Sequence, residues 1–524
     1  MRGFYVVLVV SACGGGSTEM PDASQVSDGP PLQDVGPLAD ARDSAVEGGG
    51  TIYVKASNTG YMDSFGHSLA ISADGNTVAV GATGEASAAT GIGGNQADNA
   101  APSSGAVYVF VRSNGVWSQQ SYIKASNTAS GDSFGWDVAL SSDGNTLAVG
   151  AISEDSAATR IDGDQTDNTA DSSGAVYVFV RTGTTWTQQA YVKASNTGAT
   201  DTFGWGVALS ASGDTLAIGA PGEASAAAGI DGDQLDNTAF GAGAVYVLVR
   251  SGTTWTQQSY VKASNPGSSD AFGRSVTLSG DGDTLVVGAQ SEDSAATGID
   301  GDQANNSAAN SGAVYAFTRA GTAWTQQAYI KASNTGVFDG FGYEVTLSSD
   351  GNTLAVGAPF EQSAASGINA NQLDNSALNA GAVYVFTRAA VWSQQVYIKP
   401  SNMGVEDRFG LSVALSSDGN TLLVGSIRED SAATGVNGNQ TDETMMDSGA
   451  AYLLDRVSMT WTQRTYIKAS DTGFRDLFGT QVCLSSDAAT MAISAEDESS
   501  AATGIGAVGT DVNAFQSGAV YIMQ

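Results

Sequence analysis

The feature that most constrains this chain is a unit of about 69 residues that is written seven times. A middle copy runs over 201–265, and the Phe-Gly pair near its start recurs at intervals of 68 or 69 residues. The seven phenylalanines are Phe65, Phe134, Phe203, Phe272, Phe341, Phe409 and Phe478. A repeat this regular decides the architecture, because each unit forms one supersecondary element and buries its apolar face against its neighbours.

Each repeat contains four segments with the composition of β-strands. In the second repeat these are 134–141, 146–151, 175–181 and 186–194, which we call runs a, b, c and d. Apolar residues occupy both alternation phases of run c, and runs b and c are rich in Val, Leu and Tyr, as in strands buried on both faces. No segment keeps a 3.6-residue apolar period, so we expect very little helix.

The connections between the runs alternate between tight turns and long loops. Runs a and b are joined by Ser-Asp-Gly-Asn, and runs c and d by a turn of similar length, both of which indicate hairpins. The d–a connection has about nine residues and the b–c connection about 23. Alternate connections of an up-and-down sheet share an edge, so we expect one short-turn face and one long-loop face.

Four antiparallel strands in each of seven units predict an all-β fold, a seven-bladed β-propeller. The array starts with 51–55, which matches run d, and ends with 518–522, which matches run c. The last blade therefore lacks its own fourth strand, and the N-terminal strand can supply it on the outside and close the ring. This strand lacks the Trp that opens the other d runs, so we expect the closing blade to be the weakest. An open solenoid is the alternative, but the atypical end caps that solenoids need are not visible.

The first fifty residues differ from the array. Residues 1–12 contain Arg2 and a short apolar run, too short to span a bilayer, and Val-Ser-Ala-Cys resembles a bacterial lipobox. This resemblance implies a signal peptide over 1–12, cleaved before a lipidated Cys13. Residues 13–50 are acidic and contain few apolar residues, which predicts a flexible stalk. The propeller takes 51–524, and an ordinary secretory signal is the alternative for the leader.

Charge and composition exclude several functions. The chain carries 54 acidic and 21 basic residues, a net charge of −33, which argues against nucleic acid as a partner and favours a soluble monomer. We expect Cys483 to be a core residue without a disulfide, because its counterparts are Ala. The single histidine, His67, is expected to be a variable surface residue, since Trp, Arg and Tyr replace it in other repeats.

The Phe-Gly opening and the Gly-Ala-Pro that closes run b in 219–221 and 357–359 resemble FG-GAP repeats. These repeats build the propeller of integrin α-subunits and occur in many bacterial surface proteins, so the resemblance implies this fold and an integrin-like binding surface. Integrin-type repeats often carry a DxDxDG calcium loop between strands a and b. Here that position holds a tight Ser-Asp-Gly-Asn turn, so calcium binding is not expected at it.

Three charged positions recur in every repeat, and the topology places all of them near the long-loop face. The lysines are Lys55, Lys124, Lys193, Lys262, Lys331, Lys399 and Lys468. The aspartates before Phe-Gly are Asp63, Asp132, Asp201, Asp270, Asp339, Asp407 and Asp476. The glutamates that open the b–c loop are Glu85, Glu154, Glu223, Glu292, Glu361, Glu429 and Glu498. We favour a structural clamp, in which Lys pairs with Asp or Glu and the carboxylates accept loop N–H groups, over a ligand site.

The b–c loop carries a second acidic cluster in the middle repeats. It consists of Asp162, Asp164 and Asp167, then Asp231, Asp233 and Asp236, and then Asp300 and Asp302. Carboxylates at this spacing with an intervening Gly suit Ca²⁺, which makes calcium the one cofactor the sequence suggests. The alternative is a set of Asx turns, which the replacement of Asp by Asn in a later copy favours.

The sequence leaves several functions open. Signal, stalk and propeller together suggest an exported, lipid-anchored envelope protein with a binding or adhesion module for an extracellular protein or glycan. A structural or calcium-loaded envelope protein without a dedicated ligand is the second interpretation. A carboxylate-based glycosidase or lyase is the third, but enzymes on this fold break its symmetry and the acidic positions here are uniform, so we expect no enzyme.

Overall fold

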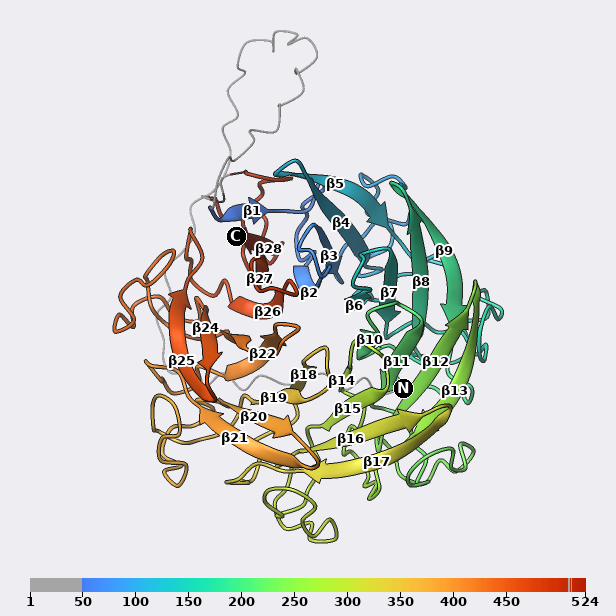
Figure 1. The fold of residues 1–524 in the computed structure, drawn as a ribbon. Coiled ribbons are helices and arrows are strands. Elements are labelled where there is room, and N and C mark those ends of the chain that lie inside the picture. Colours follow the sequence, from blue (N-terminus) through green and yellow to red (C-terminus); the bar gives the residue numbers. More distant parts are fainter. Residues whose placement is uncertain (1–49, 508, 510) are drawn as a thin grey trace, which may run out of the picture. The chain divides into compact units, whose positions relative to one another are not determined.

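The computed structural model describes residues 50–507, 509 and 511–524, and within them it contains 28 β-strands and no helix. The predicted signal peptide, the predicted stalk and Cys13 lie outside the described residues. The strands form seven four-stranded antiparallel sheets arranged as blades around a centre, as Figure 1 shows. The predicted seven-bladed β-propeller is therefore confirmed. Among the described residues no helix is long and apolar enough to cross a membrane.

The blades are numbered in chain order, and each is given from its innermost to its outermost strand. Blade 1 contains β2 (Phe65–Ile71), β3 (Thr77–Ala82), β4 (Ala106–Ser113) and β5 (Val116–Ile123). Blade 2 contains β6 (Phe134–Leu140), β7 (Thr146–Ala151), β8 (Ala175–Thr182) and β9 (Thr185–Val192). Blade 3 contains β10 (Val207–Leu209), β11 (Thr215–Ala220), β12 (Ala244–Ser251) and β13 (Thr254–Val261).

The remaining blades follow the same order. Blade 4 contains β14 (Ser275–Leu278), β15 (Thr284–Ala289), β16 (Ala313–Ala320) and β17 (Ala323–Ile330). Blade 5 contains β18 (Glu344–Leu347), β19 (Thr353–Ala358), β20 (Ala382–Arg388) and β21 (Trp392–Ile398). Blade 6 contains β22 (Phe409–Leu415), β23 (Thr421–Ser426), β24 (Ala450–Val457) and β25 (Thr460–Ile467). Blade 7 contains β26 (Phe478–Leu484), β27 (Met491–Ala495), β28 (Ala519–Met523) and the N-terminal β1 (Ile52–Val54).

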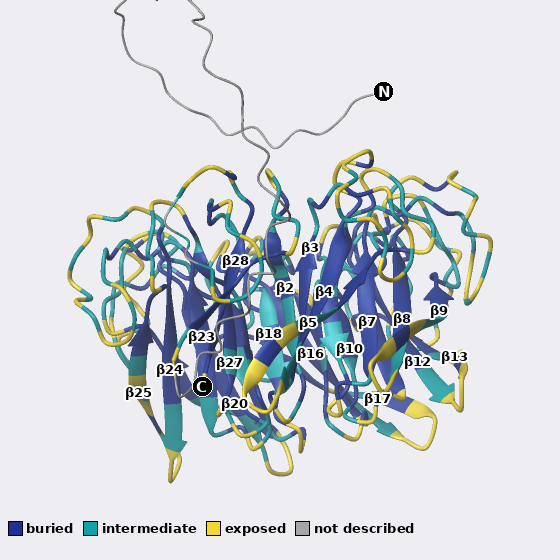
Figure 2. Ribbon diagram, turned by 90° about the horizontal axis from the view of Figure 1, so that it is seen from above, coloured by how far each residue is buried: buried dark blue, intermediate teal, exposed yellow. Residues whose placement is uncertain are grey.

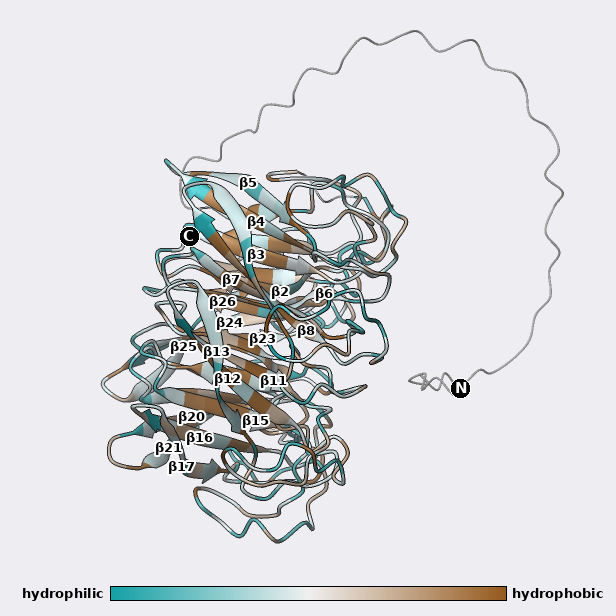
Figure 3. Ribbon diagram, turned by 90° about the vertical axis from the view of Figure 1, so that its right-hand side faces the viewer, coloured by the Kyte–Doolittle hydropathy of each residue, from teal (hydrophilic) through white to brown (hydrophobic). Residues whose placement is uncertain are grey.

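The two middle strands of each blade carry the core. All six residues of β7 and the first five of β8 are buried, as the sequence predicted for strands covered on both faces. Apolar segments run through these middle strands, for example β15 and β20 (Figure 3). Each core cluster combines residues of adjacent blades, such as Val107 and Val109 of blade 1 with Phe134 and Leu147 of blade 2. Stability therefore comes from packing between blades.

The Phe-Gly pair of one blade meets the glycine near the end of strand b of the preceding blade at every junction except the closing one. Phe134 is fully buried, and Gly135 follows it with a positive φ of 91°. A Cβ added to Gly81 of the preceding blade would lie 2.1 Å from the carbonyl oxygen of Gly135. Both glycines are needed, because two blades approach backbone to backbone at this point. At the closing junction Ser494 takes the place of the glycine on strand b and faces Gly66.

The ring is closed as predicted by pairing the N-terminal strand with the last strand. β1 pairs antiparallel with β28, with Ile52 opposite Ile522 and Val54 opposite Val520. β1 has three residues, whereas the outermost strands of the other blades have seven or eight. Among the described residues, the pairing of β1 with β28 is therefore the shortest pairing of an outermost strand.

The two faces of the ring differ as the connection lengths predicted. Figure 2 shows the long loops gathered at one end of the ring and the tight turns at the other. The long-loop face brings together the ends of run b, the ends of run d and the starts of run a from all seven blades. These are the positions that hold the repeated Lys, Glu and Asp.

Candidate functional site: the long-loop face and the channel

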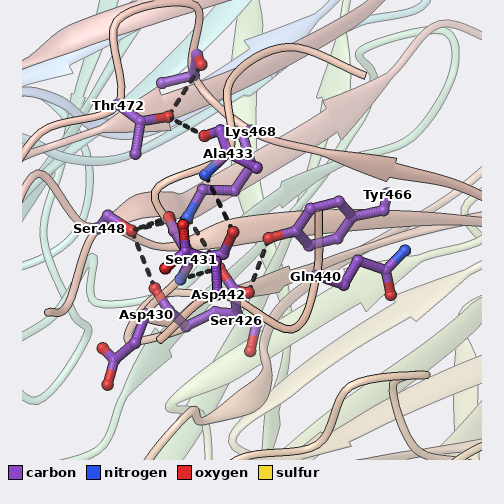
Figure 4. Close-up of polar contacts among 12 residues, drawn as sticks. Ser426, Asp430, Ser431, Ala433, Gln440, Asp442, Ser448, Tyr466, Lys468 and Thr472 are labelled. Carbon is purple, nitrogen blue, oxygen red and sulfur yellow. Dashed lines mark hydrogen bonds and ion pairs between the residues drawn. The ribbon is translucent and has the colours of Figure 1, made fainter. Parts of the chain in front are cut away.

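A buried Lys–Glu ion pair lies under the long-loop face in every blade. In blade 1 the Lys124 ammonium donates to Glu85 Oε2 and to Ser104 Oγ, both at 2.7 Å. Tyr122 OH and Asn58 Nδ2 donate to the other carboxylate oxygen of Glu85, each at 2.9 Å. Figure 4 shows the corresponding contacts of Lys468, Ser448 and Tyr466 in blade 6. We call this arrangement the Lys–Glu clamp.

The clamp is repeated with nearly constant geometry. The seven Nζ–Oε2 distances lie between 2.6 and 3.0 Å, in the pairs Lys55–Glu498, Lys124–Glu85, Lys193–Glu154, Lys262–Glu223, Lys331–Glu292, Lys399–Glu361 and Lys468–Glu429. In each blade the ion pair ties the outermost strand to the start of the b–c loop. In blade 7 the lysine comes from the N-terminal segment, so the same contact also holds the ring closed.

Burial makes the clamp important for the free energy of folding. The Lys262 side chain is fully buried, and burial lowers the pKa of its ammonium while the charge of Glu223 raises it. Removing one partner of a buried pair leaves an unpaired charge in the interior, which costs about 3–5 kcal/mol. The clamp accounts for the recurrence of Lys and Glu through stability, without a ligand.

The aspartate before Phe-Gly has a different role from the lysine's partner. Asp132 accepts a hydrogen bond from the backbone N–H of Ala129 at 2.8 Å, which closes the turn before β6. Asp63 and Asp201 make the same contact with Gly60 and Gly198. Burial raises the pKa of Asp132 to about 7. The sequence left open whether the lysine pairs with Asp or Glu. The ion pairs are made by the glutamate, and the aspartate accepts a hydrogen bond from the loop backbone.

The acidic cluster of the b–c loop is engaged in local turns. Asp164 Oδ1 accepts the N–H of Thr166 at 2.9 Å, and Asp167 Oδ1 accepts the N–H of Thr169 at 3.1 Å. Asp162 Oδ1 accepts the N–H of Tyr191, which belongs to β9.

The other members of the cluster make the same contacts in blades 3 and 4: Asp231 with Tyr260, Asp233 with Leu235, Asp236 with Thr238, Asp300 with Tyr329, and Asp302 with Ala304. These are the Asx-type contacts of the alternative interpretation. Across the described residues, no group of three or more His, Cys, Asp or Glu side chains is arranged to hold a metal ion. The calcium interpretation stays untested, and the contacts present in the loops are those of Asx turns.

The short-turn face carries a second repeated contact that sequence reasoning missed. Arg181 of blade 2 lies over Trp186 at 5.2 Å from the ring centroid and donates to Gln120 of blade 1 at 3.1 Å. Trp186 Nε1 donates to the same Gln120 oxygen at 3.0 Å. The signal was available, because one arginine recurs in run c of six repeats, five residues before the Trp of run d in five of them. This contact joins neighbouring blades at the face opposite the clamps.

An exposed apolar arc lies over part of the long-loop face. At each junction a residue late in the b–c loop of one blade is bonded through its backbone to the d–a loop of the next, as Phe515 O is to Met62 N. At four successive junctions these positions carry apolar side chains that are 45–68% exposed. They are Val337, Phe338, Leu378, Val405, Met446, Phe474, Phe515, Tyr61 and Met62. We call these nine residues the apolar arc.

The apolar arc breaks the seven-fold symmetry of the face. At the three remaining junctions the d–a positions are Ser130, Gly131, Ala199, Thr200, Ser268 and Ser269, and the one large exposed apolar side chain described there is Phe240, on the b–c side. Arginines accompany the arc, and Arg475 lies over the ring of Phe474 at 5.1 Å. All seven lysines, in contrast, are at most 2% exposed, because they form the clamps.

The central channel breaks the symmetry as well. His67 lines a cavity in the channel, and its Nδ1 lies 2.7 Å from Glu496 Oε1. The position varies between repeats, as expected, but it faces the channel once the ring closes, rather than the outer surface. The sequence variation at this position therefore gives the channel a wall of different side chains. Cys483 is buried in the core, as predicted, and forms no disulfide within the described residues.

Comparison with known proteins supports the architecture. Five segments of the chain match the FG-GAP repeat, at 117–179, 186–248, 255–317, 324–386 and 392–454, which together make up more than half of its length. No curated protein sequence matches the chain.

Solved structures that resemble the fold are distant in sequence. Kuenenia stuttgartiensis hydrazine synthase is 14% identical with a TM-score of 0.47, over 88% of this chain and 98% of that chain. Saccharomyces cerevisiae Sqt1 is 12% identical with a TM-score of 0.41, over 85% of this chain and 82% of that chain. At this level of similarity neither structure bears on function.

The matched segments also explain how the ring closes. The first one begins at Trp117 in the outermost strand of blade 1 and ends at Phe179 in the third strand of blade 2. The sequence repeat is thus offset from the structural blade by one strand, which leaves one outermost strand for the N-terminal segment. The contacts of the Phe-Gly pairs and the seven blades agree with this match over more than half of the chain. The chain therefore belongs to the FG-GAP repeat family.

Proposed function

We propose that this protein is a non-enzymatic binding module of the cell envelope that is tethered through a lipid on Cys13 and uses its long-loop face to bind a protein. FG-GAP propellers are commonly ligand-binding modules. The observation that carries the proposal is the apolar arc, in which the Tyr61 and Phe515 rings lie 5.8 Å apart, because exposed apolar patches mark interaction sites.

The composition of the arc favours a protein ligand over a glycan. Aromatic residues, Met and Arg are enriched at the centres of protein–protein interfaces, whereas Lys and Glu are depleted. The arc contains Tyr61, Phe338, Phe474, Phe515 and two methionines, and Arg475 lies beside it. Its side chains are exposed and carry little of the fold's stability, so their gathering at four consecutive junctions is best explained by an interaction.

The test compares two matched double variants. Phe474→Ser with Phe515→Ser removes the centre of the arc, and Leu235→Ser with Leu373→Ser removes two even more exposed side chains of the b–c loops outside it. The immobilised full-length proteins are incubated with an extract of envelope and extracellular proteins, and also with a glycan array. We expect a protein that the wild type and the loop variant capture and the arc variant does not. Equal capture by both variants, or binding to glycans alone, would contradict the proposal.

The envelope location has a separate test. Changing Cys13 to Ser removes the thiol that the lipobox resemblance predicts to be acylated. We expect the wild type to incorporate an alkyne-labelled fatty acid and to sediment with membranes, and the variant to do neither. A wild type that is secreted without label would favour an ordinary signal peptide.

A further inference from the structure

The channel cavity has a volume of about 500 Å³, within the range of small-molecule sites. Its lining residues come from the starts of the innermost strands and the ends of the second strands, so it lies toward the long-loop end of the channel. In blade 2 the ladder between β6 and β7 is interrupted between Phe134 and Val138. This irregularity leaves Trp136 and Asp137 outside the regular pairing, and both line the cavity.

One half of the wall is a continuous series of aromatic and cationic side chains. The His67 and Trp136 rings lie 4.6 Å apart, and the Trp136 and Trp205 rings 4.8 Å apart. The Arg274 guanidinium follows, at 5.3 Å from the ring of Trp205 and 4.1 Å from that of Tyr343. These side chains come from five consecutive blades and occupy the same repeat position. The rings are partly exposed, so apolar ring surface faces the cavity.

Two arginines at the cavity each have one buried nitrogen without an acceptor among the described residues. The Nε atoms of Arg274 and Arg408 are buried, and no protein group in the described part of the chain accepts a hydrogen bond from either. The ion pairs near Arg408 are made instead by Arg428 and Arg475, with Glu406 and Asp447. A buried donor without an acceptor is costly, and an anionic ligand would supply one.

Among the described residues, the carboxylates at the cavity form no ion pair with these two arginines. Asp137 accepts the backbone N–H groups of Val138 and Val207, and burial raises its pKa to about 7. Burial and the charge of Asp137 likewise raise the pKa of Glu344 to about 8, although the charge of Arg274 acts to lower it. Glu496 is paired with His67. The cavity therefore presents guanidinium groups and carboxyl groups able to donate protons, inside a molecule of net charge −33.

We propose that the channel cavity binds an acidic monosaccharide, a pyranose ring bearing a carboxylate. The ring's C–H face packs on Trp136 and Trp205, and the carboxylate accepts from Arg274 and Arg408. Glu344, Gln481 and Thr480, which also line the cavity, are placed to exchange hydrogen bonds with the hydroxyl groups. A simple inorganic anion would leave the aromatic surface unused, and a neutral sugar would leave the arginines unpaired.

The tryptophans themselves provide the measurement. Of the eight tryptophans, six stand in the outermost strands and are 2–4% exposed, and only Trp136 and Trp205 lie in the channel. Full-length protein is titrated with glucuronate, galacturonate, glucose, acetate and phosphate, followed by tryptophan emission and by calorimetry. We expect a saturable emission change with at least one uronate, and no saturation with glucose, acetate or phosphate over the same range.

Variants assign the signal to the channel. Arg274→Gln should weaken uronate binding at least tenfold, whereas Arg464→Gln, which changes an exposed arginine on β25, should leave it unchanged. The double variant Trp136→Phe with Trp205→Phe should abolish the emission change while calorimetry still detects binding, since Phe retains a stacking face. Equal affinity for glucose or for acetate, no saturation with any uronate, or undiminished binding in Arg274→Gln would each overturn the proposal. The apolar arc is not involved, so this result is independent of the binding partner proposed above.

Discussion

At the scale of single residues, the protein combines repeated charges that serve stability with a few varied side chains that face the channel. Lys262 and Glu223 form a buried ion pair whose worth depends on both partners being present. Asp132 is buried against loop backbone, so ionising its carboxyl group in the folded protein costs free energy. The Lys–Glu pair and the buried aspartate recur in each blade, so the effect of each on stability can be tested in one blade at a time.

The clamp predicts an asymmetric response to mutation. Lys262→Met should lower the free energy of unfolding by about 3–5 kcal/mol, because it leaves the Glu223 carboxylate buried without its counter-charge. Adding Glu223→Gln should recover part of that loss, since the amide restores a neutral interior. Urea denaturation of the wild type and both variants measures this. A Lys262→Met protein as stable as the wild type would contradict the clamp.

The buried aspartates predict that stability falls as the pH rises. A carboxyl group with a folded pKa of about 7 and an ordinary unfolded value is neutral in both states at low pH. Stability is lost as the pH rises from the unfolded pKa, where only the unfolded chain ionises, through the folded pKa. Each pKa unit corresponds to about 1.4 kcal/mol, so one such site can contribute up to about 4 kcal/mol between pH 4 and pH 8.

Asp132→Asn tests this dependence, because the amide oxygen can still accept the N–H of Ala129 without titrating. We expect the variant to lose less stability than the wild type between pH 5 and pH 8 in urea denaturation at each pH. Parallel pH profiles for the two proteins would show that the aspartate does not titrate as inferred.

At the scale of elements, the loops are built from their own hydrogen bonds and the strands from inter-blade packing. The b–c loop is held at its start by the clamp, and within the loop Asp164 and Asp167 cap successive turns. β7 and β8 are buried because blades 1 and 3 cover them. The long loops can therefore vary in sequence without disturbing the sheets, which leaves room for an apolar arc over only some junctions.

The loop geometry predicts no stabilisation by calcium. Because the carboxylates of Asp164 and Asp167 each accept hydrogen bonds from their own loop, we expect thermal melts in millimolar calcium and in excess chelator to coincide. Magnesium serves as the control for general ionic effects. A rise in melting temperature specific to calcium would instead support the calcium interpretation of the cluster.

At the scale of the whole molecule, the stability of the closed ring depends on the junction between its first and last strands. The closing blade uses the three residues of β1 where blade 6 uses the eight of β25, and Ser494 stands where other junctions have Gly. Lys55 offsets this by placing a clamp across the closure, with Glu498 at 2.6 Å. Closure also creates the channel, since its lining residues come from all seven blades.

Hydrogen exchange should identify the closing blade as the least protected. We expect the amides of β28 to exchange before those of β24, because β28 is covered by three paired residues and β24 by a full-length outer strand. Mass spectrometry of native-state exchange measures both strands in one experiment. Equal protection would mean that the Lys55 clamp compensates fully for the short strand.

Much of this architecture follows from periodicity in the sequence. Recurrence of Phe134 and its counterparts predicts seven blades, and the four runs in each repeat predict the strand order. The positions of Lys124 and Glu85 within the repeat predict a clamp near the long loops. The partner of Lys124 could not be chosen between Asp and Glu, because both lie on loops whose path depends on packing.

By itself, the sequence determined the number of blades, the strand order, the closing strand and the positions of the repeated charges. These depend on local hydrophobic alternation and on recurrence, which a linear chain records directly. Only the tertiary structure decided that His67, Trp136, Trp205, Arg274 and Tyr343 form one wall. In the sequence they are separate residues 69 positions apart that look like drift between repeats. Closing the ring brings them together, because a channel lined by one position of each blade exists only when all seven blades are in place.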